Sequence, residues 1–588
     1  MSDKIRKYVL PNLPYLFVFW FFSKIGTAYR IAPGTDFGTK LMGMLDTFPK
    51  AFETYWPGLG GIDLLVGLAG AAGVYLLIQS KIRQAKKFRR DAEYGTARFG
   101  TKEDIKPFVD PKFQNNVILT GTEFLTMNTR PKIPANARNL NACVIGSSGS
   151  GKTRFWLTPQ LLQAHSSYVV VDPKGGTLDQ CGRFLQREKY RVRVFNSIDF
   201  SKSMHYNPLA YIKTESDVLK FVTALIANTK GDGKEGDEFW TKAETLLYCA
   251  LVAYIVFEGP EEERNMNTLV EMINSMEVRE DDETFKNAVD YMFDGLERRS
   301  PQHFAVRQYK KYKLASGKTA KSILVSTAVR LAPFNLPQIQ ALTDHDDMDL
   351  YTLGEKKVAL YAVIPDNDST FNFLVSLLYA QAFQALYYSA DQIHHGPLPR
   401  HVRFVLDEFA AMPLPGFTRE LATMRSRSIS ASVIIQNMAQ IKELYKDSWE
   451  TIPGNCDTIL YLGGNESSTH KYVSEMLGKA TIDTKTHGQT KGKSGSYSTN
   501  FQMSGRELLT PDEVRKLDNR YALLFIRGAS PVMDEKYDLM HHPAISHSSL
   551  GGAAPYIHHG TKPPIYTGRP LLRVGGTENS NPLKGEFH

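Results

Sequence analysis

Cysteine is scarce in this chain of 588 residues, which has four, at Cys143, Cys181, Cys249 and Cys456. They are scattered and form no Cys-x-x-Cys pair, so the spacing of a zinc site or a disulfide framework is missing. We expect buried, reduced thiols in a cytosolic domain. The excess of positive over negative charge is also small. The net charge of +8 permits a nucleic-acid or anionic-lipid partner without requiring one. No internal repeat and no protease or nuclease constellation is apparent.

What the sequence does contain is a phosphate-binding loop at residues 146–153, which read Gly-Ser-Ser-Gly-Ser-Gly-Lys-Thr. An apolar run ending at Ile145 predicts a strand before this P-loop, and residues 154–157 predict the start of a helix after it. In that context the glycines turn backbone N–H groups around phosphate oxygens, and the helix N-terminus adds positive potential. We expect Lys152 to reach the β- and γ-phosphates of ATP, and Thr153 to hold Mg²⁺. The residues expected to contact the nucleotide are Gly146, Ser147, Ser148, Gly149, Ser150, Gly151, Lys152 and Thr153.

A second motif, Arg-Phe-Val-Leu-Asp-Glu-Phe at residues 403–409, is an apolar strand that ends in two acids. Asp407 is expected to position Mg²⁺ through water, and Glu408 to orient or deprotonate the attacking water. An apolar strand ending in an acid is common by itself. Its position after a complete P-loop is what makes it informative.

Three further residues are candidates for catalysis. Gln436 ends the apolar run 433–435 and is expected beside the γ-phosphate, although a glutamine in an ordinary strand-to-helix turn is the alternative. Arg425 and Arg427 offer two guanidinium groups, one of which could reach a neighbouring subunit's γ-phosphate as an arginine finger. A solvated surface arginine is the alternative for each of them.

The candidates for contact with nucleic acid carry a weaker signal. Residues 307–313 (Arg-Gln-Tyr-Lys-Lys-Tyr-Lys) interleave bases and aromatics, as a platform for single strands would. The same pattern fits a solvated amphipathic helix, which we favour. The span 484–502 is rich in Gly, Ser, Thr and Lys and predicts a mobile loop. Its Lys485, Lys491 and Lys493 either meet phosphates or simply keep the loop soluble.

Apolar, β-rich runs alternate with helical stretches, which predicts a mostly parallel sheet with helices on both faces. The expected strands lie near residues 167–171, 190–195, 358–364, 402–406, 431–435, 458–462 and 521–526. Between about 214 and 344 a helical periodicity replaces them, so an all-α domain interrupts the α/β core. The expected organisation is a transmembrane anchor and basic linker (1–90), a nucleotide-binding domain in two parts (91–213 and 345–545), the all-α domain (214–344) and a flexible tail (546–588).

Two apolar runs near the N-terminus approach the ~20 residues needed to cross a bilayer. They cover about 8–29, if Lys24 snorkels, and about 62–80. Lysine and arginine flank their outer ends, so the positive-inside rule places both termini in the cytoplasm, with a short external loop between the spans. A cleaved signal peptide is the alternative, because Gly26-x-Ala28 resembles a cleavage site. Cleavage would leave the ATP site outside the cell, and we therefore favour the anchor.

Taken together, the motifs resemble the type IV secretion coupling proteins, the conjugation ATPases of the VirD/TraG group. The resemblance covers nearly the whole chain. It rests on the P-loop and on residues 94–99 (Tyr-Gly-Thr-Ala-Arg-Phe), 159–162 (Pro-Gln-Leu-Leu), 169–175 (Val-Val-Val-Asp-Pro-Lys-Gly), 406–409 (Leu-Asp-Glu-Phe), 435–436 (Ile-Gln) and 506–513 (Arg-Glu-Leu-Leu-Thr-Pro-Asp-Glu). The family pattern often continues Asp-Pro-Lys-Gly with Glu. Gly176 stands there in this chain, so a role for that acid is in doubt.

This resemblance implies a RecA-like P-loop NTPase core with an inserted all-α domain and a two-helix transmembrane anchor. It implies a multi-pass protein of a bacterial cell membrane, forming a homo-hexamer at the mouth of a conjugation channel. The implied partners are a relaxase joined to single-stranded DNA and components of the type IV secretion channel, with cargo docking on the all-α domain. In this scheme ATP lies between subunits, and Arg425 or Arg427 acts on the neighbour's nucleotide.

Two alternatives remain open at this stage. A double-stranded DNA translocase of the chromosome-partitioning type also joins membrane helices to a RecA-like motor, but the short tail leaves no room for the usual winged-helix reader. An ATP-binding cargo receptor without motor activity is the second alternative, against which the intact Glu408 argues weakly.

Overall fold

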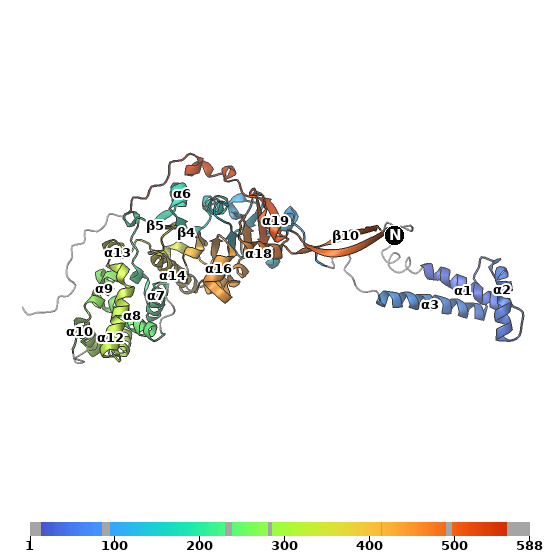
Figure 1. The fold of residues 1–588 in the computed structure, drawn as a ribbon, viewed down its shortest axis with the longest axis horizontal. Helices are drawn as coiled ribbons and strands as arrows, with labels where there is room; N and C mark the ends of the chain where they lie inside the picture. The colour runs from blue at the N-terminus through green and yellow to red at the C-terminus, as the bar shows by residue number, and fades with distance from the viewer. Residues whose placement is uncertain are drawn as a thin grey trace, which may run out of the picture. The chain divides into compact units, whose positions relative to one another are not determined.

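The computed structural model describes residues 13–84, 94–229, 238–279, 285–412, 414, 416–489 and 497–560. Contacts within the chain define two compact units (Figure 1). The first comprises Met1–Glu93 together with Lys485–Met503, and the second comprises Tyr94–Thr484 together with Ser504–His588. The sheet and the inserted helices therefore belong to the same unit.

The N-terminal unit contains a helical hairpin made of α1 (Leu13–Ile31) and α3 (Gly61–Gln84). The helices run antiparallel, since Tyr15 meets Tyr75 at one end and the Arg30 guanidinium pairs with the Asp63 carboxylate at 3.1 Å at the other. They approach closely through small residues, as membrane helices do. A Cβ on Gly70 would lie 2.1 Å from the Phe22 ring.

The segment between these two helices differs from the short external loop that we expected. It contains a further helix, α2 (Phe37–Phe52), whose N-terminus is capped by the Asp36 carboxylate, which accepts the Thr39 N–H. The loop prediction failed because the apolar residues of this segment recur at helical spacing and form a stripe, which a search for charge alone does not detect.

Within the described residues, two helices are long and apolar enough to cross a membrane: Gly61–Lys81 in α3, and α8 (Glu238–Glu258). The α3 stretch leaves its leucines exposed, whereas α8 is mostly buried in the second unit and is a core helix there. Helix α1 continues past Lys24, as expected, and the Lys24 ammonium donates to the Thr54 carbonyl at 2.6 Å. The part of the predicted first span at 8–12 lies outside the described residues.

The second unit is built on a nine-stranded sheet with the strand order β13-β12-β9-β3-β8-β7-β4-β6-β5. Strands β3 to β9 run parallel, and β12 and β13 add an antiparallel edge. The expected mostly parallel sheet is thus confirmed. The strands are β3 (Ala142–Ile145), β4 (Ser167–Pro173), β5 (Arg191–Asn196), β6 (Val358–Ile364), β7 (Val402–Leu406), β8 (Ile429–Ile435), β9 (Thr458–Tyr461), β12 (Tyr521–Ile526) and β13 (Val532–Glu535).

Both faces of this sheet are covered by helices, which explains why its strands read as continuous apolar runs. In β3, Ala142 and Val144 pack into one core, and Cys143 and Ile145 pack into the other. All four cysteines are buried free thiols, as expected. The flanking elements are α4 (Lys102–Ile105), β1 (Asn116–Ile118), β2 (Phe124–Thr126), α5 (Thr158–Leu162), α6 (Gly176–Arg187), α14 (Asn372–Tyr388), α15 (Phe417–Thr423), α16 (Met438–Tyr445), α17 (Thr451–Gly454), α18 (Ser467–Leu477) and α19 (Pro511–Arg515).

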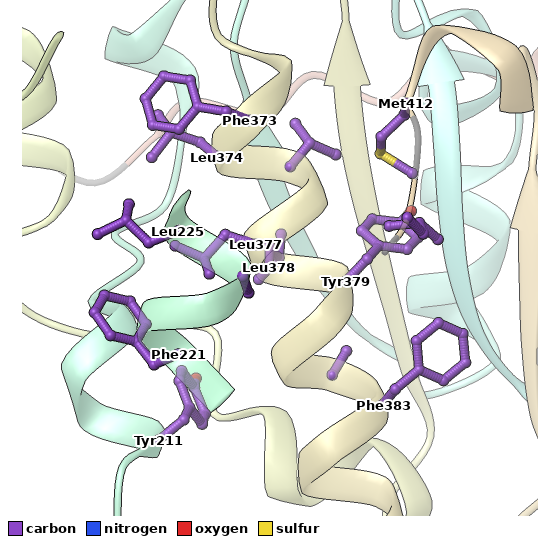
Figure 2. Close-up of a cluster of buried hydrophobic side chains, with 14 of the residues drawn as sticks. Tyr211, Phe221, Leu225, Phe373, Leu374, Leu377, Leu378, Tyr379, Phe383 and Met412 are labelled. Atoms are coloured by element: carbon purple, nitrogen blue, oxygen red, sulfur yellow. The ribbon is translucent and has the colours of Figure 1, made fainter. Parts of the chain in front are cut away.

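An all-helical segment fills the interval between β5 and β6. Besides α8 it consists of α7 (Glu215–Asn228), α9 (Met266–Asn274), α10 (Ala288–Arg299), α11 (Phe304–Tyr312), α12 (Gly317–Arg330) and α13 (Pro337–Leu342). Helix α14 joins it to the sheet, as Figure 2 shows. One of its faces carries Leu374 and Leu378 toward α7, and on another face Phe383 stacks on Phe404 of β7 at 4.0 Å. This shared core explains why sheet and helices form a single unit.

Helix α11 carries the bases and aromatics that suggested a platform for nucleic acid. Its Tyr309 is buried and stacks on Phe293 at 3.9 Å, and its hydroxyl donates to the Asp290 carboxylate. The Lys313 ammonium pairs with the same carboxylate at 2.9 Å. The tyrosines therefore belong to the core, which supports the amphipathic helix rather than a stacking platform.

The span 484–502, which we predicted to be a mobile loop, contributes to two strands. These are β10 (Lys479–Gln489) and β11 (Tyr497–Glu507), which form a two-stranded sheet. The loop prediction is wrong for the described part, because alternating Thr and Ser side chains suit a strand as well as a loop. Lys491 and Lys493 lie outside the described residues, and the side chain of Lys485 is not described either.

The predicted flexible tail is ordered over its first part. Tyr556 is buried against Gly182 of α6, and its N–H donates to the Asp179 carbonyl at 3.0 Å. His542, just before the tail, is also buried, and burial lowers the pKa of its imidazole to about 4. The expectation of a loose tail is therefore wrong up to Gly560, and the rest lies outside the described residues.

Candidate functional site

The predicted site residues gather at one edge of the sheet because three neighbouring strands are parallel. The P-loop follows β3, Gln436 follows β8, and Asp407 follows β7, with β8 lying between the other two strands. The carboxyl ends of parallel strands meet at the same edge, where ligands bind in open α/β sheets. The sequence motifs are thereby brought within reach of one another.

The P-loop has the backbone shape of an anion-binding nest. Gly149 and Gly151 have φ angles of +78° and +87°, in the left-handed region that favours glycine. The N–H groups of Ser148, Gly149 and Gly151 donate to no acceptor in the part of the chain that the structure describes. The hydroxyl of the buried Ser150 also lacks a partner there. These donors fit the phosphate oxygens of a nucleotide.

Lys152 and the start of the following helix complete the loop. The Lys152 side chain is largely buried, and its ammonium donates to the Ser147 carbonyl at 3.3 Å, across the mouth of the loop. The helix expected after the loop begins as a π-turn over Thr153–Leu157 and continues as α5. Single π-turns inside helices are frequent at functional sites.

A second lysine, which the sequence did not point to, supports the loop from outside. Lys536 follows β13, and its ammonium donates to the Ser150 carbonyl at 3.0 Å and to the Asn519 side-chain oxygen at 2.7 Å. Burial lowers the pKa of Lys536 to about 8. Because a trans peptide is planar, a Ser150 carbonyl that faces Lys536 turns the Gly151 N–H in the opposite direction. Lys536 thus fixes the orientation of one N–H group of the nest.

Thr153 and Asp407 form the pair expected to hold Mg²⁺. The Thr153 hydroxyl donates to the Asp407 carboxylate at 3.2 Å. Burial raises the pKa of Asp407 and the neighbouring Glu408 carboxylate raises it further, while Lys152 opposes both effects. A hydroxyl and a carboxylate are the oxygen donors that Mg²⁺ prefers, so this pair fits the ion together with nucleotide phosphates.

Glu408 and Gln436 are also brought together. The Gln436 amide donates to both carboxylate oxygens of Glu408, at 3.0 and 3.3 Å. Glu408 has a φ of +52°, a strained backbone conformation for a residue with a side chain. Such strain is characteristic of functional positions. The arrangement holds one carboxylate at the edge of the site, restrained by an amide.

Asp172 lies near the end of β4, in the Asp-Pro-Lys-Gly motif. In the pattern that the sequence resembles, this motif is often followed by Glu, whereas Gly176 follows it here. Its carboxylate accepts the N–H groups of Thr177 and Leu178 at 3.1 and 2.7 Å, and so satisfies the first turn of α6. Burial raises the pKa of Asp172 to about 6. Lys174, two residues after Asp172, pairs with Asp366 at 2.5 Å. These residues order the turn at Gly176.

Arg425 and Arg427 are not brought to this site. They lie in a short 3₁₀ helix (Met424–Arg427) that precedes β8, whereas Gln436 follows β8. The seven residues of that strand separate its ends by about 23 Å. Arg427 forms a two-pronged ion pair with Asp391, and Arg425 donates to the Thr129 carbonyl at 3.0 Å. Neither arginine can therefore act on a nucleotide bound to its own chain.

At the level of sequence, a family model of conjugative DNA transfer and two similar proteins match this chain. The family model described as "Type IV secretory system Conjugative DNA transfer" matches residues 105–542. Protein VirD4 of Rhizobium radiobacter is 24% identical over 411 residues, which are 68% of this chain and 56% of that protein. The conjugal transfer protein TraG of Escherichia coli is 23% identical over 499 residues, 78% of this chain and 76% of that protein. The chain thus spans a little over half the length of its VirD4 relative.

Solved structures show the same fold. The unbound bacterial conjugative coupling protein TrwBdeltaN70 superimposes with a TM-score of 0.54 at 15% identity, covering 76% of this chain and 95% of that one. The plasmid coupling protein TrwB in complex with ADP and Mg²⁺ gives a TM-score of 0.53, covering 75% and 93%. The chain therefore shares the fold of these solved coupling proteins, in agreement with the RecA-like core expected from the sequence.

Proposed function

Because the chain belongs to the type IV secretory system conjugative DNA transfer family, we propose that it is a membrane-anchored ATPase that couples single-stranded DNA with its relaxase to a type IV secretion channel. The observation that carries this proposal is the convergence of the P-loop, Asp407, Glu408 and Gln436 at one sheet edge. Binding of ADP and Mg²⁺ by the structurally similar TrwB supports a nucleotide at this edge.

The proposed hydrolysis assigns each group at this edge a task. The nest and Lys152 bind the β- and γ-phosphates of ATP, and Thr153 with Asp407 would hold Mg²⁺, which would neutralise phosphate charge. Glu408 accepts a proton from the water whose oxygen attacks the γ-phosphorus. The bond from that phosphorus to the bridging oxygen breaks, and ADP leaves with the electron pair. Gln436 holds Glu408 in position and responds to the γ-phosphate.

Completion of the site requires another copy of the chain. Since Arg425 and Arg427 lie about 23 Å from the sheet edge that binds ATP, they contribute only if a neighbouring subunit presents them. A head-to-tail homo-hexamer, as the family resemblance implies, supplies this geometry. Arg425 is the better candidate of the two, because Arg427 is already neutralised by Asp391. An arginine supplied in trans is worth about 10³- to 10⁵-fold in rate where it has been established.

The remaining parts have proposed roles outside the ATP site. The helices of the N-terminal unit anchor the protein in a bacterial cell membrane as a multi-pass segment, which the apolar surface of Gly61–Lys81 supports. The all-α segment docks cargo. An apolar cavity of about 350 Å³ between α8, α9 and α10 supports this role, and its lining includes Tyr254, Met272 and Met292.

The test is ATP turnover by the full-length protein in lipid nanodiscs, with single-stranded DNA, with double-stranded DNA and without DNA. We expect stimulation by single-stranded DNA, and a fall in turnover of about 10²- to 10⁴-fold in Glu408→Gln, because the proton acceptor is lost. Glu258→Gln is the matched control, since the Glu258 side chain is only 24% exposed but lies at the end of α8 in the all-α segment, where it pairs with Arg299.

Each outcome separates the proposed function from its rivals. Stimulation by double-stranded DNA alone would favour a translocase of the chromosome-partitioning type. ATP binding without turnover, in protein confirmed to be hexameric, would favour the cargo receptor and refute the motor.

A further inference from the structure

Two connections join the sheet to the inserted helices, one leaving β5 and one returning to β6. They lie side by side: the Asp347 N–H donates to the His205 carbonyl at 3.0 Å, and the Tyr206 N–H donates to the Leu342 carbonyl at 2.8 Å. His205 lies on the outgoing connection, and His345 and Asp347 lie on the returning one. Residues 140 positions apart in sequence thus meet at the junction between the two parts of this unit.

Three potential metal ligands converge at this junction. His205 Nδ1 lies 2.7 Å from Asp347 Oδ2, and His345 Nε2 lies 3.8 Å from the same oxygen. The two imidazole rings are 3.8 Å apart between centroids. One ligand atom from each residue lies within 4.8 Å of the other two. Ligands on a tetrahedral ion with bonds of about 2.0–2.1 Å are about 3.3 Å apart, so small side-chain rotations would close the set on a metal.

The far side of His345 carries the feature that usually accompanies a ligating histidine. Its Nδ1 faces the Asp344 carboxylate at 3.7 Å, while its Nε2 faces Asp347. At 3.7 Å this contact is longer than a hydrogen bond, and a rotation of the Asp344 side chain toward the ring would form the bond that fixes the tautomer of a ligating histidine and makes its ligating nitrogen more basic. His345 is half-exposed, so an ion can reach the three residues from solvent, whereas His205 is buried and rigidly placed.

We propose that His205, His345 and Asp347 form a binding site for a divalent transition metal ion of the Zn²⁺ class. Two imidazoles and one carboxylate suit Zn²⁺ or Co²⁺, whereas Mg²⁺ and Ca²⁺ prefer oxygen ligands alone. Water fills the fourth position. The ion replaces the proton shared by His205 Nδ1 and Asp347, and that proton is released to solvent. The bound ion links the two connections and so restrains the all-α segment against the sheet.

The site is independent of the ATP-binding edge. The His345 side chain projects from a connection, and its truncation to alanine leaves the hydrogen bond between His205 and Asp347 in place. His345→Ala is therefore the variant least damaging to the fold. His394→Ala is its matched control, because His394 also pairs with a carboxylate, Glu355 at 2.6 Å, in a pair that includes no third ligand among the described residues.

The test is equilibrium dialysis of the full-length protein, stripped with EDTA, against Zn²⁺ and separately Co²⁺. We expect the wild type and His394→Ala to bind one equivalent that His345→Ala fails to bind, and Asp344→Asn to weaken that equivalent about 10-fold. Saturating Zn²⁺ should raise the melting temperature of the wild type and of His394→Ala but not that of His345→Ala. ATP turnover by His345→Ala at the wild-type rate would show that this variant is folded.

Equal binding of both ions by the wild type and His345→Ala would overturn the proposal and leave a hydrogen-bonded His205–Asp347 pair as the whole role of the cluster. Loss of the equivalent in His394→Ala as well would also overturn it, because the binding would then depend on surface histidines in general.

Discussion

Replacing Lys536 by methionine should weaken ATP binding even though Lys536 lies outside the P-loop. Its ammonium holds the Ser150 carbonyl at 3.0 Å, and the planar peptide turns the Gly151 N–H the opposite way. Methionine fills a similar volume but cannot donate a hydrogen bond. The peptide between Ser150 and Gly151 is then free to rotate, and the positive φ of Gly151 makes both orientations accessible.

The expected size follows from one hydrogen bond. A bond to a charged group contributes about 1.5–3 kcal/mol, so an ATP phosphate that loses the Gly151 N–H binds about 10- to 100-fold more weakly. The free energy of unfolding should also fall by about 1–3 kcal/mol, because the buried Ser150 carbonyl loses its partner. Turnover at saturating ATP should change little, since Lys536 contacts neither Glu408 nor Asp407 in the structure.

Measurement of the ATP dissociation constant between pH 7 and pH 10 tests this reasoning more sharply. Burial lowers the pKa of folded Lys536 to about 8 from an ordinary 10.5, so the wild type should bind ATP less tightly above pH 8 as this charge is lost. The unfolded chain holds more protons than the folded chain in that window, so this group makes the fold more stable as pH rises. Weaker binding above pH 8 therefore cannot result from unfolding through Lys536.

Lys536→Met should show no such decline, and Lys516→Met, at an exposed lysine, should behave like the wild type. An ATP affinity of folded Lys536→Met equal to that of the wild type would refute the idea that this lysine orients the loop. Equal pH profiles in Lys536→Met and the wild type would refute the role of its charge.

Two further substitutions test steric features of the fold. Gly151→Ala should abolish ATP binding, as measured by calorimetry. The new Cβ would lie 2.4 Å from the Phe155 ring, and a φ of +87° is strained for alanine. Retention of wild-type affinity would contradict the loop geometry. Gly182→Ala should lower the free energy of unfolding by about 1–3 kcal/mol, because its Cβ would lie 2.6 Å from the Tyr556 ring. Truncating the chain after residue 552 should remove the penalty of Gly182→Ala, and a penalty that persists would show that Tyr556 is not its cause.

Much of the sheet could be predicted because its strands are buried on both faces. Runs such as Val402–Leu406 contain no residue that favours solvent except Arg403, and such continuity is typical of parallel strands between helix layers. The strand order could not be predicted, because parallel strands pair across long insertions that local periodicity does not record. The two-stranded sheet of β10 and β11 was missed because its polar composition outweighed its alternation, and helix α2 was missed because its apolar helical stripe was not sought in a segment judged by its charge.

The candidate site likewise contains residues that the sequence points to and one that it does not. Lys152, Thr153, Asp407 and Glu408 lie in short motifs whose spacing reflects a single loop or strand end, and the sequence is sufficient to propose them as site residues. Lys536 was missed because its relation to the P-loop exists only across the sheet, almost 400 residues along the chain. Its one local signal is a lysine directly after an edge strand, and lysines are common at such positions.

The topology of the sheet also bears on the proposed assembly into a ring. Every group proposed to bind or activate ATP follows the carboxyl end of a parallel strand, whereas Arg425 precedes the amino end of β8. A parallel strand cannot bring both of its ends to one ligand. In the proposed function, a chain with this fold would therefore present ATP at one edge and the arginine finger at the other, and the two would meet only between neighbouring subunits. Mixing Lys152→Ala subunits with Arg425→Ala subunits should accordingly restore partial turnover at those interfaces where an intact P-loop faces an intact arginine. Failure of such mixtures to exceed either variant alone would contradict the arrangement in trans.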